Sequence, residues 1–219
     1  MMHLAGLALL LIIRDVDGVN QQPLHPGAGK ANALFVVTNE CPISNSFAHE
    51  IARICADYKS KGIGCALVYV DAALSDDQAR KHAKEYGHGD YPKIVDRKHE
   101  LVKATGVMIT PEVAVVNRAG KVVYRGRIDD SFAALGQPRR PVKNADLRDA
   151  LDDIVAGRPV AKPETKALGC YIADFAASDT RSETGPKRFA LELSAGFVVS
   201  STQTRSDFGS AHATVPVEP

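Results

Sequence analysis

The pattern of apolar and polar residues divides most of this chain into short strands and amphipathic helices. Continuous apolar runs of strand length stand at residues 34–38, 65–70 and 93–95. Apolar residues at helical spacing mark residues 42–58, 75–86, 99–105 and 145–156. Because strands that alternate with helices form a sheet with helices packed against it, the pattern predicts an α/β fold.

A β-hairpin is expected after the third predicted helix. Strands at 112–117 and 122–127 are separated by Arg118-Ala-Gly-Lys121, which is a turn sequence. Thr110-Pro111 leads into the first of these strands. A hairpin adds antiparallel strands to parallel ones, so we expect a central mixed β-sheet flanked by helices on both faces.

Cys41 carries the clearest chemical signal, because it stands between a predicted strand and a predicted helix that begins at Pro42. Proline suits the first helical turn, where its missing N–H costs no hydrogen bond. A thiol at a helix N-terminus faces unpaired N–H groups and the positive end of the helix dipole, and both favour the thiolate. The thiolate is the nucleophile of disulfide exchange and of peroxide reduction, so Cys41 is the candidate catalytic residue.

Cys41-Pro-Ile-Ser-Asn45, taken together with Thr110-Pro111, resembles the thioredoxin-like superfamily and, within it, bacterial redoxin-domain proteins of the alkyl hydroperoxide reductase/thiol-specific antioxidant type. The resemblance implies a thioredoxin-like fold, with a cis Thr110-Pro111 bond beside the nucleophile and substrate binding by Pro42, Thr110 and Pro111. It also implies a thiol–disulfide oxidoreductase without an organic cofactor. Protein or small-molecule disulfides would be its substrates, and an external thiol its electron donor.

Ser44 stands where thioredoxin carries the second cysteine of Cys-x-x-Cys, so a mixed disulfide on Cys41 cannot be resolved within the motif. Ser44 is either a hydrogen-bond donor to the thiolate or a polar residue of the first helical turn. Cys170 is the candidate resolving cysteine, in a segment at 163–172 that we expect to move and that contains Gly169. This segment also resembles the C-terminal end of the same redoxin-domain proteins. A one-cysteine mechanism stays open beside the pairing of Cys41 with Cys170.

Peroxide reduction by Cys41 through a sulfenic acid is the alternative activity, with hydroperoxides as substrates. Peroxiredoxins carry Pro-x-x-x-Thr-x-x-Cys, whose proline and threonine shape the peroxide pocket. Thr38 occupies the threonine position and is a candidate substrate-binding residue, but Leu34 stands in place of the proline and argues against this activity. A third interpretation is a non-catalytic domain of thioredoxin fold that only binds a partner.

No metal site is predicted. Cys55 and Cys65 fall at apolar positions and are interpreted as packing residues. Four histidines lack ligand spacing and are expected at the surface: His49, His82, His88 and His99. Binding of Cu(I) by Cys41 and Cys170 is the weaker alternative.

Composition and domain organisation add few constraints. The net charge of +1 gives no electrostatic footprint for nucleic acid. Residues 1–13 are apolar and are either signal-like or a first strand, so export to the periplasm and a cytoplasmic location both stay open for a protein of bacterial type. The expected redoxin domain spans 14–160, a tail segment at 161–174 carries Cys170, and 175–219 is interpreted as a poorly ordered extension.

Overall fold

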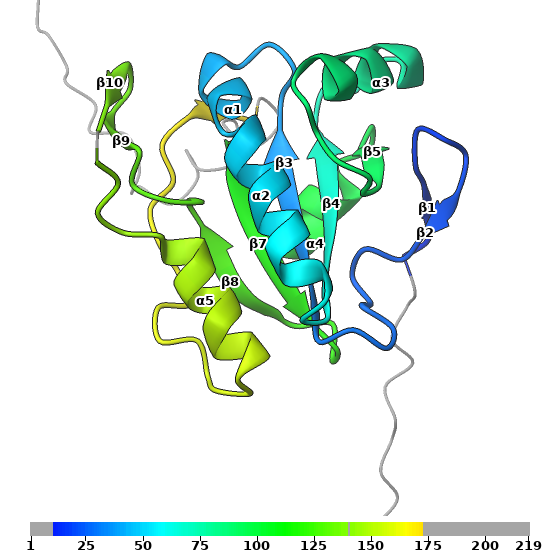
Figure 1. Cartoon of the computed structure of the whole chain (residues 1–219). Helices are drawn as coiled ribbons and strands as arrows, with labels where there is room; N and C mark the ends of the chain where they lie inside the picture. The colour runs from blue at the N-terminus through cyan, green and yellow to red at the C-terminus, as the bar shows by residue number, and fades with distance from the viewer. Residues whose placement is uncertain (1–10, 140, 173–219) are drawn as a thin grey trace, which may run out of the picture. The chain divides into compact units, whose positions relative to one another are not determined.

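A computed structural model describes residues 11–139 and 141–172 (Figure 1). Its centre is a five-stranded sheet in the order β5-β4-β3-β7-β8. These strands are β3 (Ala31–Val37), β4 (Ile63–Tyr69), β5 (Lys93–Val95), β7 (Glu112–Asn117) and β8 (Val122–Gly126). The central strand β3 pairs in parallel with β4 and antiparallel with β7. The predicted mixed sheet, including its C-terminal hairpin, is confirmed.

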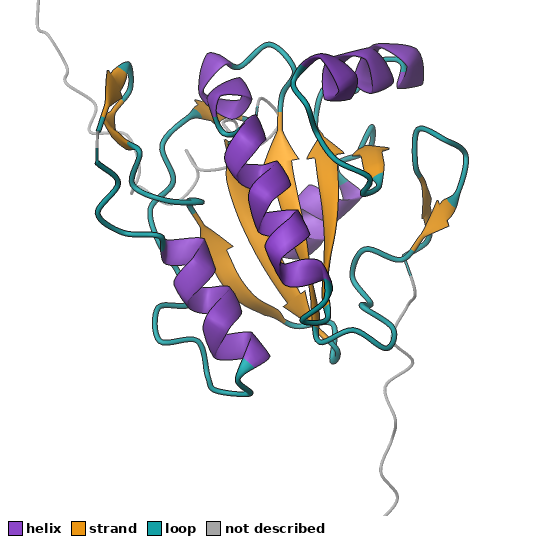
Figure 2. Cartoon of the chain, viewed as in Figure 1, coloured by secondary structure: helices purple, strands orange, loops and turns teal. Residues whose placement is uncertain are grey.

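Helices lie on both faces of this sheet, as predicted (Figures 1 and 2). They are α1 (Pro42–Ser46), α2 (Ala48–Lys59), α3 (Asp76–Glu85), α4 (Glu100–Thr105) and α5 (Asp146–Val155). Side chains of α2 and α5 pack into one hydrophobic cluster with one set of sheet residues, whereas α4 contributes to a second cluster with the alternate set. Both faces of β3 are therefore buried, which explains why its sequence is a continuous apolar run.

The predicted helix at 42–58 is interrupted at Phe47, and this corrects the expectation of one continuous helix. The N–H of Phe47 donates to the carbonyl of Ser44, 3.1 Å away, so the chain tightens for one turn between α1 and α2. The Phe47 side chain is buried and its ring centroid lies 5.8 Å from that of Phe132. Phe132 comes from a later segment that no local periodicity connects to this helix.

The N-terminal region forms a separate small hairpin. β1 (Ile13–Arg14) pairs with β2 (Asn20–Gln21), and the N–H groups of Asp17 and Val19 donate to the Asp15 carboxylate in the turn between them. Residues 1–10 and the expected extension at 175–219 lie outside the described residues. Within the described ranges, no helix combines the length and apolar character needed to cross a membrane.

Two further short pairings were not anticipated from the sequence. β9 (Phe132–Ala134) and β10 (Gln137–Pro138) form a small hairpin between β8 and α5. More important for the chemistry, β6 (Ile109–Thr110) pairs antiparallel with β11 (Cys170–Tyr171). Figure 1 shows the chain after α5 running back, in yellow, to bring β11 beside α1.

Candidate functional site

Cys41 occupies the N-cap position of α1, where the chain turns from the end of β3 into the helix. Its backbone is extended and Pro42 takes the first helical position, as predicted from the Cys-Pro step. The side chain is nearly buried, with 4% of its surface exposed. The thiol is therefore held in one place at the carboxyl end of the central strand.

The surroundings of Cys41 favour its ionised form. Burial acts to raise the pKa of the Cys41 thiol, but hydrogen bonds from the Ser44 backbone and hydroxyl, the Cys170 thiol and the Ile43 N–H outweigh it. The net result is a pKa below the ordinary value for a thiol. The first turn of α1 thus supplies the stabilisation of a thiolate that the Cys-Pro sequence predicts.

Ser44 is positioned for this purpose. Its side chain is 2% exposed, and within the described residues its hydroxyl has no hydrogen-bond partner of ordinary geometry, although it lies near enough to Cys41 to lower the pKa of that thiol. A buried hydroxyl without a partner is costly, whereas one that donates to a thiolate is satisfied. This arrangement favours Ser44 as a hydrogen-bond donor to the Cys41 thiolate over Ser44 as only a polar residue of the first helical turn.

Replacing Ser44 with alanine is expected to raise the pKa of Cys41 and slow its alkylation by iodoacetamide at pH 7. Loss of one hydrogen bond to a charged group corresponds to about a tenfold effect. The measurement is the pH dependence of alkylation at Cys41, followed by peptide mass spectrometry. Ser46→Ala is the matched control, because Ser46 is an exposed serine of the same helix that bonds to the Ile43 carbonyl. Equal pH profiles for Ser44→Ala and wild type would remove Ser44 from the site.

Cys170 lies next to Cys41, although the two residues are far apart in the sequence. The pairing of β11 with β6 sets Cys170 opposite Thr110, and the two sulfur atoms are 3.6 Å apart. Burial and the neighbouring Cys41 raise the pKa of Cys170 above the ordinary thiol value. The pKa values of the two thiols are therefore shifted in opposite directions, and Cys41 is the more acidic thiol.

The segment at 163–172, which we call the strap, is held firmly against the domain. The N–H of Arg125 donates to the Pro163 carbonyl, and the N–H of Thr165 donates back to the Arg125 carbonyl, at 2.8 and 3.0 Å. The Thr165 hydroxyl lies 2.8 Å from the Tyr124 hydroxyl. We expected a segment free to move, but these contacts hold the strap along β8.

Gly169 permits the final approach of the strap to the site. A Cβ atom on this residue would overlap the carbonyl group of Thr110, so any other residue would displace β11 from β6. The sequence left two roles open for Gly169, local freedom and close approach of the chain. The structure shows close approach of two backbones.

Of the remaining predicted substrate-binding residues, Thr38, Pro42 and Thr110 lie beside Cys41, whereas Pro111 lines a separate small cavity with Phe47 and Leu168. The Thr110-Pro111 peptide bond is cis, and the Cys41 sulfur lies 3.8 Å from the Thr110 carbonyl oxygen. The Thr38 hydroxyl is 3.5 Å from the Thr110 hydroxyl. Thr38 and Pro42 line a hollow of about 300 Å³ together with Cys41 and Cys170. Sequence reasoning missed Asp71, which lines the same hollow from the loop after β4.

The features that would favour peroxide chemistry are incomplete. Leu34 is fully buried in the middle of β3 and cannot shape a pocket at Cys41. Arg125 and Arg127, at the end of the hairpin, are the arginines that could approach the thiolate. Arg125 instead donates to the Gly106 carbonyl and pairs with Glu164, and Arg127 pairs with Asp146. Among the described residues that line the hollow around Cys41, none is an arginine.

Cys55 and Cys65 are not part of this arrangement. Cys55 is buried in the core cluster with Cys65 packed against that cluster, and burial together with the Cys65 thiol strongly raises the pKa of Cys55. Its burial and the direction of this shift disfavour the thiolate, in line with the interpretation of Cys55 as a packing residue. Within residues 11–139 and 141–172, no group of three or more potential ligands is placed to hold a metal ion.

The expectation of surface histidines is wrong for His82 and His99, which are both buried. His82 is bonded to the Tyr69 hydroxyl through Nδ1 at 2.9 Å and to Asn45 Oδ1 through Nε2 at 3.0 Å. It therefore links α3 to α1, the helix that carries the site. Its spacing from Ala79 and Ala83, which share the buried face of α3, was the signal that could have revealed this.

Acidification is expected to destabilise the fold partly through His88. Burial, followed by the nearby positive charges of His82, Lys93 and His49, lowers the pKa of His88 to about 4. The unfolded chain then binds more protons between pH 6.5 and pH 4, so this contribution to stability is complete above pH 6.5 and is lost as the pH falls.

Between pH 7 and pH 5, the free energy of unfolding should fall by about 2 kcal/mol more in the wild type than in His88→Gln. Glutamine keeps a polar group beside the Tyr91 hydroxyl, to which His88 Nδ1 is bonded at 2.8 Å. Urea denaturation at the two pH values measures the difference. Parallel losses in the two proteins would exclude His88 as a source of acid sensitivity.

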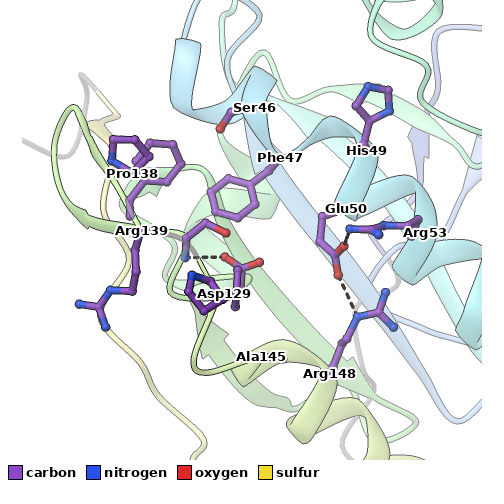
Figure 3. A pocket seen from close by; sticks show the side chains of 14 residues that line it. Ser46, Phe47, His49, Glu50, Arg53, Asp129, Pro138, Arg139, Ala145 and Arg148 are labelled. Atoms are coloured by element: carbon purple, nitrogen blue, oxygen red, sulfur yellow. Dashed lines mark hydrogen bonds and ion pairs between the residues drawn. The ribbon is translucent and has the colours of Figure 1, made fainter.

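A larger hollow of about 730 Å³ lies between α2, α5 and the β9–β10 segment, and it includes neither Cys41 nor Cys170 (Figure 3). Glu50 accepts from Arg53 and, at 2.8 Å, from Arg148 Nε. Asp129 accepts from the Ser131 N–H at 2.8 Å, and Arg139 pairs with Asp130, which does not line the hollow. This hollow contains neither of the two thiols that lie side by side, so it is separate from the candidate site.

Comparisons with known proteins identify a family and similar structures. The sequence model of the Redoxin family matches residues 16–136, which is more than half of the chain. An uncharacterized conserved protein from Geobacillus kaustophilus has a similar structure, with 29% sequence identity, a TM-score of 0.65, and coverage of 74% of this chain and 88% of its own. A hypothetical protein from Sinorhizobium meliloti 1021 matches with 24% identity and a TM-score of 0.65, over 74% of this chain and 89% of its own.

No curated protein matches the chain. The match to the family model includes β3, the Cys41 turn and the Thr110-Pro111 step, and it ends before the strap. The chain belongs to the Redoxin family, and its mixed five-stranded sheet with helices on both faces and a cis proline after Thr110 is the predicted thioredoxin-like fold.

Proposed function

We propose that this protein is a thiol–disulfide oxidoreductase in which Cys41 is the nucleophile and Cys170 the resolving cysteine. The observation that carries the proposal is the 3.6 Å separation of the two sulfur atoms, combined with pKa shifts of opposite direction. A thiolate beside a protonated thiol is the arrangement that a two-step exchange requires. The membership of the chain in the Redoxin family supports the same class of chemistry.

In the first step, the Cys41 thiolate attacks one sulfur of the substrate disulfide. The S–S bond of the substrate breaks, a mixed disulfide forms on Cys41, and one substrate thiol leaves with a proton from solvent or from Cys170. In the second step, the Cys170 thiolate attacks the sulfur of Cys41 and expels the second substrate thiol. The protein then carries a Cys41–Cys170 disulfide, which an external dithiol must reduce before the next cycle.

Thr38, Pro42 and Thr110 are proposed as substrate-binding residues, because they line the hollow beside the sulfur atoms or contact Cys41. Pro111, joined to Thr110 by the cis peptide bond, is proposed with them because of the family resemblance. Ser44 is proposed to stabilise the thiolate in the free enzyme and the leaving thiolate of Cys41 during reduction. The proposed catalytic domain includes the strap at 163–172, which lies outside the residues matched by the family model. No organic cofactor is needed for the two steps.

The test is turnover of 2-hydroxyethyl disulfide with dithiothreitol as electron donor, measured beside consumption of hydrogen peroxide under the same conditions. Saturable disulfide reduction, with peroxide consumed no faster than by an unfolded thiol, is expected. Peroxide reduction that exceeds disulfide reduction by orders of magnitude would indicate a peroxidase instead. Inertness toward both oxidants would indicate a domain that only binds a partner.

A further inference from the structure

The strap already occupies the strand position beside Cys41. Cys170 pairs with Thr110, and the N–H of Ile172 donates to the Met108 carbonyl at 3.0 Å. A polypeptide that used the edge of β6 to bring a disulfide to Cys41 would need the place that β11 fills. On the basis of the proposed function, we propose that Cys41 accepts small disulfides without net negative charge and that the strap excludes disulfide-bearing polypeptide strands.

Contacts on both sides of Cys170 hold the strap in place, so its displacement costs free energy. Upstream of Cys170, Ala167 is buried and Thr165 is bonded to Tyr124 and to the N–H of Arg127. Downstream, Ile172 is buried in the hydrophobic cluster that contains α4. A competing strand would have to expose both buried side chains and replace these hydrogen bonds before reaching the sulfur of Cys41.

The open approach to Cys41 is the hollow of about 300 Å³, a volume that suits a small molecule. It is lined by Thr38, Asn39, Glu40, Cys41, Pro42, Asp71 and Cys170. Two of these residues carry carboxylates, and none is a lysine, arginine or histidine. A disulfide that bears carboxylates would meet like charge there, whereas a neutral or cationic one would not.

The decisive experiment isolates the first step. In a Cys170→Ser background the strap keeps its backbone pairing and Cys41 cannot be resolved, so formation of the mixed disulfide is a single reaction. Its second-order rate constant is measured by mass spectrometry for cystamine, 2-hydroxyethyl disulfide, 3,3′-dithiodipropionate and a neutral twelve-residue peptide disulfide. The reaction of each probe with free 2-mercaptoethanol normalises its intrinsic reactivity.

After normalisation, cystamine and 2-hydroxyethyl disulfide should react about tenfold faster than the dianion 3,3′-dithiodipropionate. Their advantage over the peptide disulfide should be larger than tenfold. Adding Gly169→Ala, which forces β11 away from Thr110, should raise the peptide rate about tenfold and leave the rate of 2-hydroxyethyl disulfide within about threefold. Ile172→Ala loosens the other end of the strap and should act in the same direction. Lys166→Ala is the matched control on an exposed strap residue and should change nothing.

Charge selectivity is tested separately by Glu40→Gln and Asp71→Asn in the same background. Each substitution should reduce the difference between the normalised rate constants of 3,3′-dithiodipropionate, the dianion, and cystamine, the cation. Equal normalised rates for peptide and small disulfides, unchanged when either end of the strap is loosened, would overturn the proposed exclusion while leaving the exchange function intact. Failure of Cys41 to form an adduct with any probe would overturn the proposed function itself.

Discussion

Replacing Cys41 with serine should lower disulfide turnover by about a thousandfold or more, because a serine hydroxyl does not ionise near neutral pH and cannot replace the thiolate. The structure gives a specific reason to expect so large an effect. The backbone and hydroxyl of Ser44 and the N–H of Ile43 stabilise the charge of this one sulfur. The measurement is steady-state turnover of 2-hydroxyethyl disulfide with dithiothreitol.

The control for this prediction is Cys65→Ser. It removes a thiol whose side chain packs against the core cluster and which does not line the hollow around Cys41. Cys65→Ser should keep near-wild-type turnover. Substantial activity in Cys41→Ser would transfer the nucleophilic role to another residue and contradict the assignment.

Replacing Cys170 with serine should separate the two chemical steps. The first attack by Cys41 remains, because the strap and the first turn of α1 are intact, but the mixed disulfide can no longer be resolved within the protein. Turnover should fall by about a hundredfold, since a bound neighbouring thiol acts at a far higher effective concentration than an external one. At the same time, a protein–substrate adduct on Cys41 should accumulate.

The adduct is measured by intact-mass spectrometry of samples quenched with acid during turnover. A Cys170→Ser protein that cycles as fast as the wild type, with no adduct, would show that the donor thiol resolves Cys41 directly. Cys170 would then be a neighbour of the catalytic residue with no part in the reaction.

The sequence was sufficient for those parts of the fold that local patterns encode. Buried strands such as β3 and β4 appear as continuous apolar runs because both of their faces are covered. The capping box of Ser75 and Gln78 marks the start of α3 by direct side-chain bonds to nearby backbone. The Cys-Pro step likewise identifies Cys41, since the relevant N–H groups come from Ile43 and Ser44, directly after Pro42.

The parts that the sequence could not supply depend on contacts between distant residues. The turn at Phe47 follows its packing against Phe132, and the position of the strap follows its pairing with Thr110. A two-residue strand such as β11 has too little periodicity to be predicted. The sequence therefore indicated Cys170 as a candidate, but only the structure gives the distance between its sulfur and that of Cys41.

The most direct test of the central claim is disulfide mapping of the full-length protein. Fully reduced protein is treated with one equivalent of 2-hydroxyethyl disulfide, alkylated, digested without reduction and analysed by peptide mass spectrometry. Cys41 linked to Cys170 as the main product, with Cys55 and Cys65 recovered as alkylated thiols, is the predicted result. A stable adduct on Cys41 beside a free Cys170, or a link between Cys55 and Cys65, would contradict the two-cysteine mechanism.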